Sequence, residues 1–219
     1  MISVIMSSFL SDYPKCANRR EDRFRFAVRS FLKQENKNSE LIIISDGCGI
    51  TETIWNNEFR NESRIIFDRV PRHKEFSGTP RNHGISIANG SLICYLDSDD
   101  FIGPSHLSII IDNFTADIDW CFYDDYCFVG HNIFKKRNVN IKEMRIGTCS
   151  ICHKKEIDVK WEDGYGHDHN FIKKMLEKEY VYKKISTPQY FVCHVPVRGN
   201  HFDIDNPNYS FESQEKRKH

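Results

Sequence analysis

The sequence predicts an α/β domain built on an open, mostly parallel, twisted sheet with helices on its faces. Two observations indicate this class. Short apolar runs recur along the first half of the chain, and each is short enough for a strand and apolar enough to be buried on both faces. The segments between these runs have helical spacing instead. Strand and helix alternating in this way is typical of a sheet whose strands run parallel.

Four runs rich in β-branched residues are the predicted strands of the first half: Ile2–Met6, Leu41–Ile44, Arg64–Phe67 and Leu92–Leu96. The first predicted helix carries an apolar face at i, i+3, i+4, i+7 and i+8: Phe24, Ala27, Val28, Phe31 and Leu32. Thr79 and Pro80 supply a cap and a first-turn proline for a second helix over Arg81–Ala88, and Pro104 starts a third.

The second half departs from this alternation. Its predicted elements are a strand over 119–128, a basic and weakly patterned stretch over 133–145, a strand over 147–153, a helix over 167–179 and a strand over 190–195. No internal repeat is present. We therefore expect one domain over 1–209, with a nucleotide-binding type of front half (1–112) and a different back half (113–209), followed by a frayed tail (210–219).

Composition excludes several classes of protein. Lys and Arg together number 31, as do Asp and Glu, so no overall positive field would attract nucleic acid. The chain has no run of 18 apolar residues and no basic leader, which predicts a soluble cytoplasmic protein without a transmembrane segment. The eight cysteines are expected to be free thiols. Cys149, Cys152 and His153 match a haem-attachment spacing, but their segment alternates like a strand, and a zinc finger would need a second ligand pair.

Polar residues follow three of the predicted strands directly. Ser7 and Ser8 follow the first, Asp46 the second, and the run Asp97–Asp100 the fourth. The carboxyl ends of parallel strands share one edge of a sheet, where ligands bind in this class of fold. The first strand is not followed by a glycine-rich loop, which disfavours a dinucleotide-binding dehydrogenase. The acidic run suits Mg²⁺ or Mn²⁺ with substrate phosphates; alternatively, one carboxylate caps the helix near Pro104.

Taken together, these segments resemble glycosyltransferase family 2, whose members have the GT-A fold. ISVIMSSF, LIIISDG, SGTPRNHGISIANGSLICYLDSDD and GHDHNFIKKML match its opening strand, DDGS-like turn, ARNxGxxxAxG helix, LDxDD metal motif and ED motif. The resemblance is close over 1–112 and looser over 119–195. Three residues depart from the pattern: Ser45 replaces the first Asp of the turn, Cys48 replaces its Ser, and His167 replaces the Glu of the ED motif.

The resemblance implies a metal-dependent, inverting enzyme of polysaccharide biosynthesis that moves a sugar from a UDP-linked donor to a glycan or lipid-linked saccharide, with peripheral membrane contact through a lipid-linked acceptor. Residues 1–112 would bind the donor and 113–209 the acceptor. Ser7 and Ser8 would lie beside the nucleotide and Asp46 would accept a hydrogen bond from the base. The remaining donor-binding residues implied are Arg81 near the diphosphate, Asp97 near the ribose or a metal-bound water, and Ser98 between the two aspartates.

The resemblance further implies that Asp99 ligates Mn²⁺ or Mg²⁺, with His194 or His201 as a third ligand, and that Asp168 is the general base. Each assignment has a plainer alternative. Arg81 could be an exposed helix residue, His194 a core histidine, and Asp168 a helix-dipole partner with Asp163 or Glu162 as the base. The basic run Lys135–Arg137, with Lys142 and Arg145, could face an acidic acceptor or only solvent. A nucleotidyltransferase and a non-catalytic sugar- or nucleotide-binding module are the competing functions.

Overall fold

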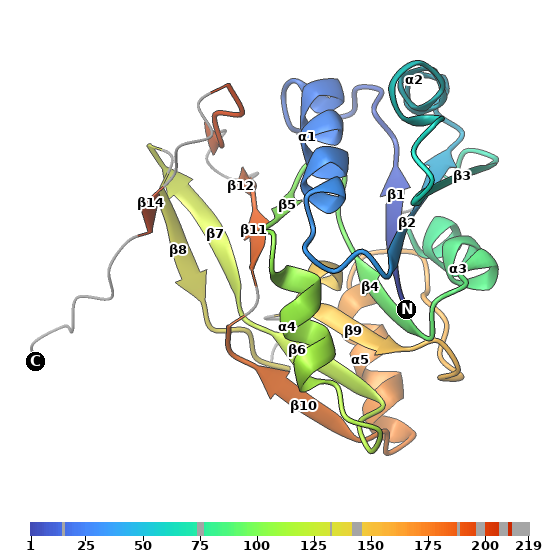
Figure 1. Cartoon of the computed structure of the whole chain (residues 1–219), viewed down its shortest axis with the longest axis vertical. Coiled ribbons are helices and arrows are strands. Elements are labelled where there is room, and N and C mark those ends of the chain that lie inside the picture. Colours follow the sequence, from blue (N-terminus) through green and yellow to red (C-terminus); the bar gives the residue numbers. More distant parts are fainter. Residues whose placement is uncertain are drawn as a thin grey trace, which may run out of the picture.

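The structure of the protein is a computed structural model, and it describes residues 1–14, 16–73, 77–131, 133–141, 146–187, 189–195, 200–205 and 210–211. Its main sheet has seven strands in the order β10-β6-β9-β4-β1-β2-β3 (Figure 1). Their bounds are β1 Ile2–Ser8, β2 Ser39–Asp46, β3 Ile65–Val70, β4 Leu92–Tyr95, β6 Trp120–Tyr123, β9 Ile151–Lys154 and β10 Tyr182–Ile185. Only β9 runs antiparallel to its neighbours in this sheet. The sheet is therefore mostly parallel, which confirms the predicted α/β class.

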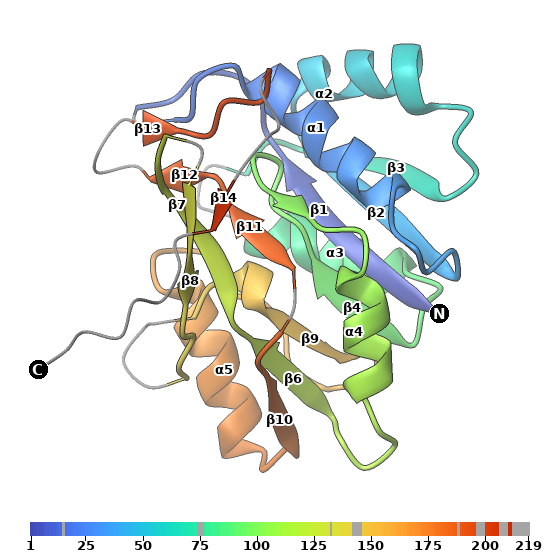
Figure 2. The same ribbon diagram turned by 60° about the vertical axis from the view of Figure 1, so that its left-hand side comes forward.

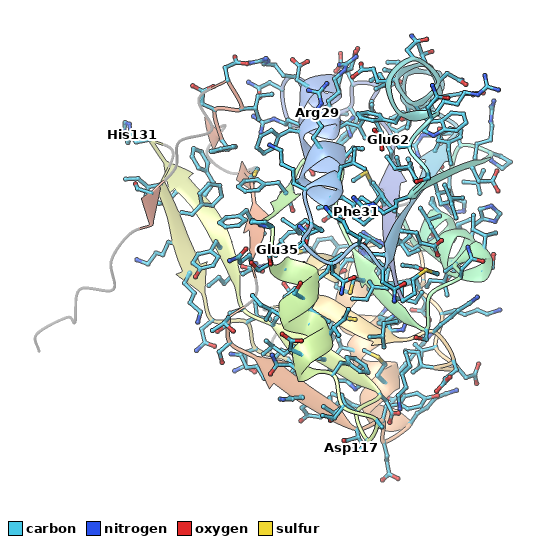
Figure 3. All side chains as sticks on the ribbon, viewed as in Figure 1. Arg29, Phe31, Glu35, Glu62, Asp117 and His131 are labelled. Atoms are coloured by element: carbon cyan, nitrogen blue, oxygen red, sulfur yellow. The ribbon has the colours of Figure 1, made fainter. Side chains whose placement is uncertain are left out.

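Helices cover both faces of this sheet because alternate strand residues point to opposite sides. On one side, Val4 and Met6 pack with α1 (Arg20–Leu32), α2 (Gly49–Ile54), a π-helical turn (Trp55–Phe59) and α4 (His106–Asn113). On the other side, Ile5 packs with α3 (Gly78–Ile87) and α5 (His167–Glu177). Helix α1 places some residues in the core and others at the surface: Phe31 is fully buried, while Arg29 pairs with Glu58 over 3.2 Å. Figure 3 labels Phe31 and Arg29 on this helix.

A second sheet lies beside the main sheet, on the side away from β3 (Figures 1 and 2). Its order is β14-β8-β7-β11-β5, with β5 Phe101–Ile102, β7 Asp125–Gly130, β8 Ile133–Arg137, β11 Tyr190–Val192 and β14 Ser210–Phe211. An aromatic core holds it together, in which Phe101 and Phe191 stack with ring centroids 4.4 Å apart. A short ribbon, β12 (His194–Val195) paired with β13 (Asn200–His201), completes this part of the chain.

Two predicted strands prove to be two elements each. The strand expected over 119–128 divides at Asp124 into β6 and β7, which belong to different sheets. The buried Asp124 carboxylate accepts a hydrogen bond from the Val139 N–H at 2.9 Å and pairs with Lys136 and Lys184, so the chain turns there. The strand expected over 190–195 divides at Cys193, whose N–H donates to the Asp100 carboxylate at 2.8 Å.

Three smaller differences concern the back half. A 3₁₀ turn (η2, Thr148–Ser150) occupies the start of the strand predicted over 147–153, and β9 begins after it. Ser210 and Phe211, expected to be frayed, form β14 parallel to β8, whereas residues 212–219 lie outside the described residues. In the basic run, Lys136 pairs with the buried Asp124 and Arg137 with the buried Asp125, and the two basic side chains keep 30% and 39% of their surface exposed. Lys142 and Arg145 lie outside the described residues.

The eight cysteines are free thiols, as expected, and His153 lies on β9 rather than in a haem-binding loop. Among the helices that the structure describes, none combines the length and the apolar character needed to cross a membrane.

Candidate active site

A pocket of about 610 Å³ opens at the carboxyl ends of β1, β2 and β4. Its lining includes all six predicted donor-binding residues: Ser7, Ser8, Asp46, Arg81, Asp97 and Ser98. The predicted metal ligand Asp99 and the predicted base Asp168 line it as well. The backbone of His194 forms β12, in register with His201, but its side chain lies outside the described part of the chain. The structure thus brings eight of the nine predicted residues to one pocket.

Asp46 stands at the end of β2 and is buried, at 5% exposure. Its carboxylate accepts hydrogen bonds from the Arg72 guanidinium and from the His73 N–H, the latter at 2.6 Å. The Arg72 guanidinium carbon lies 3.7 Å from the centroid of the Phe9 ring, so Arg72 also stacks on an aromatic face. Both Phe9 and Arg72 line the pocket and were missed by the sequence reasoning. The available signal was their position one residue after β1 and two residues after β3.

The turn after β2 gives Ser45, one of the departures from the family pattern, a structural role. The Ser45 hydroxyl accepts a hydrogen bond from the Cys48 N–H at 3.0 Å and donates one to the Cys48 carbonyl at 2.9 Å. Gly47 has a φ of +62°, and a Cβ there would come within 2.6 Å of the Arg72 backbone nitrogen. Ser45 therefore closes the turn internally, and Asp46 alone presents a carboxylate from this segment to the pocket.

The acidic run after β4 places its three carboxylates differently. Asp97 and Asp99 line the pocket, whereas Asp100 is buried beneath it. Asp100 accepts hydrogen bonds from the Tyr190 hydroxyl at 3.0 Å and from the Cys193 N–H at 2.8 Å. The expectation that Asp100 caps the following helix is wrong, because α4 begins after Ser105 and Asp100 is engaged by β11 and Cys193 instead.

Burial raises the pKa of all three carboxyls. At Asp97 the Arg81 charge opposes this effect, while Asp99 and Asp168 add to it; at Asp99 the opposing charges are Arg20 and Arg23. A raised carboxyl pKa means that the ionised form is unfavourable where it stands, so an added cation would stabilise it.

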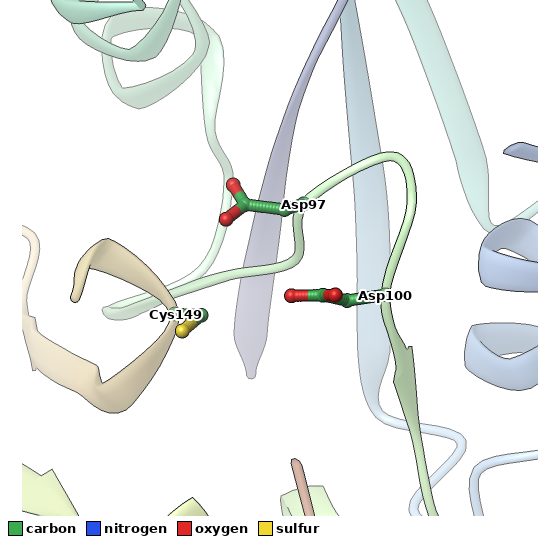
Figure 4. A group of neighbouring side chains, drawn as sticks. All are labelled: Asp97, Asp100 and Cys149. Atoms are coloured by element: carbon green, nitrogen blue, oxygen red, sulfur yellow. The ribbon is translucent and has the colours of Figure 1, made fainter. Parts of the chain in front are cut away.

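A divalent cation fits the carboxylates of this site better than the thiol. Asp97, Asp100 and Cys149 each bring one candidate ligand atom within 4.8 Å of the others (Figure 4). Carboxylate oxygens suit Mn²⁺ and Mg²⁺, whereas a thiol must ionise to act as a ligand and suits softer metals. Burial holds the pKa of the Cys149 thiol well above its usual range. Within this group, the donors that suit a hard cation are therefore the carboxylates of Asp97 and Asp100.

Arg81 projects from the first half of α3 and is 6% exposed, so the alternative of a solvated surface residue is wrong. Its Nη2 lies 3.7 Å from the Asp97 carboxylate, and its guanidinium carbon lies 5.1 Å from the Trp161 ring centroid. Its Nη1 is buried without a hydrogen-bond partner among the described residues. A buried N–H without a partner is unfavourable, and an anion in the pocket could satisfy it.

Asp168 lies in the first turn of α5 and keeps 29% of its side chain exposed. The Thr148 hydroxyl donates to it, and His167 Nε2 lies 3.2 Å from the same oxygen. Burial acts to raise the pKa of Asp168, but the bond to His167, the charges of His167 and Arg81 and the Thr148 bond outweigh it and lower that pKa. The carboxylate is therefore ionised at neutral pH and reachable from the pocket.

The two alternative bases are engaged elsewhere. Asp163 accepts hydrogen bonds from the Thr79 N–H at 3.0 Å and hydroxyl at 2.8 Å. Glu162 pairs with Lys174 and accepts a bond from Asn170 at 3.0 Å. Neither acid lines the pocket. Of the three acids, only Asp168 has access to a substrate there.

Comparison with known proteins adds a family and a fold. The model of "Glycosyl transferase family 2" matches residues 15–180. EpsH of Bacillus subtilis strain 168, which is named as a glycosyltransferase, is 30% identical over 86 residues, or 39% of this chain and 25% of EpsH. The crystal structure of S. aureus TarS 1–349 superimposes with a TM-score of 0.65 at 16% identity, covering 87% of this chain and 60% of that one.

TarS 1–349 in complex with UDP-GlcNAc gives the same TM-score of 0.65 at 17% identity, covering 87% of this chain and 58% of that one. The chain thus spans less than two thirds of the length of these relatives. The superposition shows the GT-A fold, in agreement with the mostly parallel sheet and its flanking helices. The family match extends over most of the chain, from just before α1 to just after α5, and begins after β1. The chain therefore belongs to glycosyltransferase family 2.

Proposed function

We propose that this glycosyltransferase moves a sugar from a UDP-linked donor to a hydroxyl of a glycan or lipid-linked saccharide, with inversion, and that Asp168 is its general base. The observation that carries the proposal is the make-up of one pocket. This pocket is lined by four of the charged residues: Asp168, Asp97, Asp99 and the buried Arg81, whose Nη1 has no partner among the described residues. The complex of TarS with UDP-GlcNAc supports the choice of a uridine nucleotide as donor.

Direct displacement needs a nucleophile, a leaving group and a base. The acceptor oxygen would form a bond to the anomeric carbon from the face opposite the nucleotide. The bond between that carbon and the phosphate oxygen would break, and UDP would leave with the electron pair. The acceptor proton would pass to the Asp168 carboxylate, which is ionised and exposed to the pocket. A single displacement of this kind inverts the anomeric configuration.

The pocket residues divide the remaining tasks. Arg81 would bind the diphosphate through Nη1, which a planar guanidinium with several donors suits. Asp46 would accept a base N–H, with the Phe9 and Arg72 pair beside it. Asp97 and Asp99 would hold Mn²⁺ or Mg²⁺, with His194 or His201 as a candidate third ligand. When bound, the ion would neutralise charge that develops on the departing diphosphate.

The donor is identified first. Thermal unfolding with a panel of nucleotide sugars, each with Mn²⁺, should single out one nucleotide, because a ligand at 100 times its Kd adds about 2.7 kcal/mol of stability. Release of UDP from the selected sugar then measures turnover, with water as the acceptor in place of the natural hydroxyl.

The base is tested with Asp168→Asn, which keeps shape and capping ability but cannot take the proton. Turnover should fall by about two to four orders of magnitude, while the melting temperature and the calorimetric affinity for UDP with Mn²⁺ stay at wild-type values. Glu162→Gln is the matched control, since Glu162 precedes the same helix but does not line the pocket. Near-normal turnover of the Asp168→Asn variant, or a product with retained configuration by NMR, would refute the proposal.

A further inference from the structure

His167 makes contacts through both ring nitrogens. Nδ1 lies 3.0 Å from the Gly164 carbonyl oxygen, and Nε2 lies 3.2 Å from Oδ1 of Asp168. A carbonyl oxygen only accepts hydrogen bonds, so Nδ1 carries a proton. The Asp168 carboxylate also accepts when it is ionised, so its contact with Nε2 is a hydrogen bond only if Nε2 carries a proton too. Each ring nitrogen of His167 therefore faces an oxygen that can accept a hydrogen bond.

The two protein donors to Asp168 meet at one oxygen. The Thr148 hydroxyl, from the 3₁₀ turn before β9, donates to Oδ1, and so does His167 Nε2. Among the described residues, none donates to Oδ2. Two donors at one carboxylate oxygen fix the position of that oxygen, and the other oxygen remains available as an acceptor. Asp168 lines the pocket, so Oδ2 is the oxygen that can serve a substrate hydroxyl.

The surrounding structure fixes His167 in turn. Its ring, 12% exposed, lies 6.0 Å from the Trp161 ring at an angle of 65°. Trp161 stacks on Phe171 of α5 at 4.0 Å, so the imidazole packs against a rigid aromatic pair. Gly164 and Gly166 have φ values of +102° and +84°, which lets the chain return its Gly164 carbonyl to Nδ1 just before the helix begins.

We propose that His167 is a positioning residue for Asp168: together with Thr148 it holds Oδ1, so that Oδ2 faces the acceptor hydroxyl and takes its proton. The inference rests on the proposed role of Asp168 as the base. It gives a role in positioning the base to His167, the residue that stands in place of the Glu of the family's ED motif. An acidic side chain in the place of the imidazole would set a second negative charge against Oδ1, whereas His167 and Thr148 both present donors to it.

The test compares kcat and KM for UDP release from the selected UDP-sugar. His167→Phe keeps a planar ring but has no N–H, and should lower kcat about 10- to 100-fold, the range for loss of a hydrogen bond to a charged group. KM for the donor and calorimetric UDP affinity should not change, because His167 acts on the base. His167→Gln, whose amide can donate to Oδ1, should recover most of the lost kcat. His83→Phe is the matched control, since His83 contacts Asp68 over 2.8 Å outside the pocket.

A double variant separates positioning from a merely structural role. If His167 acts through Asp168, adding His167→Phe to Asp168→Asn should lower turnover no further. Unchanged kcat in the Phe variant, a further additive loss in the double variant, or an equal loss in His83→Phe would each overturn the inference. Near-normal turnover of Asp168→Asn alone would instead overturn the proposed function. Should the Phe variant not fold, Thr148→Val removes the second donor to Oδ1, and its kcat must fall; Thr148→Ser, which keeps the hydroxyl, must recover most of that loss.

Discussion

The Asn82 carboxamide holds the backbone of Trp161 with two hydrogen bonds, donating from Nδ2 to the carbonyl over 2.8 Å and accepting from the N–H over 2.9 Å. Its neighbour Arg81 lies over the Trp161 ring. Two consecutive residues of α3 therefore hold one tryptophan by its backbone and its ring. Trp161 in turn packs against His167 and Phe171. Trp161 therefore connects Arg81, on the donor side of the pocket, with the helix that carries Asp168.

Removal of the Asn82 carboxamide should weaken both the fold and the site. Asn82→Ala leaves the Trp161 N–H and carbonyl without their partners, and the free energy of unfolding should fall by about 1–3 kcal/mol. Urea unfolding measures this change. Asn57→Ala, at an exposed position of the π-helical turn, should stay within about 0.5 kcal/mol of wild type. Equal stabilities of the two variants would show that the double contact contributes nothing.

Metal removal should abolish turnover through the carboxylates of the acidic run. EDTA should stop UDP release, and Mn²⁺ or Mg²⁺ should restore it. Asp99→Ala should lower turnover about 10²-fold or more, because charge on the departing diphosphate would no longer be neutralised. Burial raises the pKa of Asp99, so its charge is unfavourable in the fold, and the variant should melt no earlier than wild type without metal. Full activity in EDTA would contradict a metal role.

Asp46 should determine nucleotide affinity and leave the chemical step unchanged. An ionised carboxylate can accept a uracil N3–H, and Asp46→Asn replaces one acceptor oxygen by a donor. Affinity for UDP should fall about 10- to 100-fold by calorimetry, while kcat at saturating donor changes little. The substitution also weakens the Arg72 contact, so Arg72→Gln is measured beside it. Unchanged UDP affinity in Asp46→Asn would remove Asp46 from the site.

The front half of the fold could be predicted because its signals are local. β1 and β2 are buried on both faces, so their apolar residues form continuous runs, and the polar residues that follow them reach the ligand edge by topology alone. Asp46, Asp97 and Asp99 could be assigned to one pocket on that basis. The same reasoning could have found Phe9 and Arg72, which lie one residue after β1 and two residues after β3.

The back half could not be predicted because its positions depend on distant partners. Asp100 is held by Tyr190 and by the backbone of Cys193, about ninety residues away, and no local pattern encodes that contact. Thr148 reaches Asp168 because β9 inserts antiparallel between β4 and β6, which places the turn before it at the pocket. The apolar stretch over 119–128 also forms two strands, β6 and β7, which belong to different sheets and are separated by the buried Asp124.

His153 should make the protein less stable in mild acid. A directed chain of hydrogen bonds runs beneath the pocket: Trp161 Nε1–H donates to the Tyr95 oxygen over 2.8 Å, and the Tyr95 hydroxyl is 2.6 Å from His153 Nε2. His153 Nδ1–H donates to the Lys154 carbonyl over 2.7 Å. Every group in this chain is satisfied when the imidazole is neutral. A second proton on His153 would leave the Tyr95 hydroxyl without its acceptor.

Burial accordingly lowers the pKa of His153 to about 4, from an ordinary value of 6.5. Between those two values the unfolded chain binds a proton that the folded protein does not, so the free energy of unfolding should fall as the pH falls from about 6.5 to about 4. One such proton changes stability by about 1.4 kcal/mol per pH unit. Burial also lowers the pKa of His106, to about 3, so His106 likewise makes the free energy of unfolding fall as the pH falls. Urea unfolding at pH 7, 6 and 5 should therefore show that the free energy of unfolding falls less steeply in His153→Gln than in wild type, with the remaining fall due to His106. The Gln amide oxygen can accept the Tyr95 hydrogen bond without titrating. An equally steep decline in that variant would mean that His153 does not stay neutral in the fold.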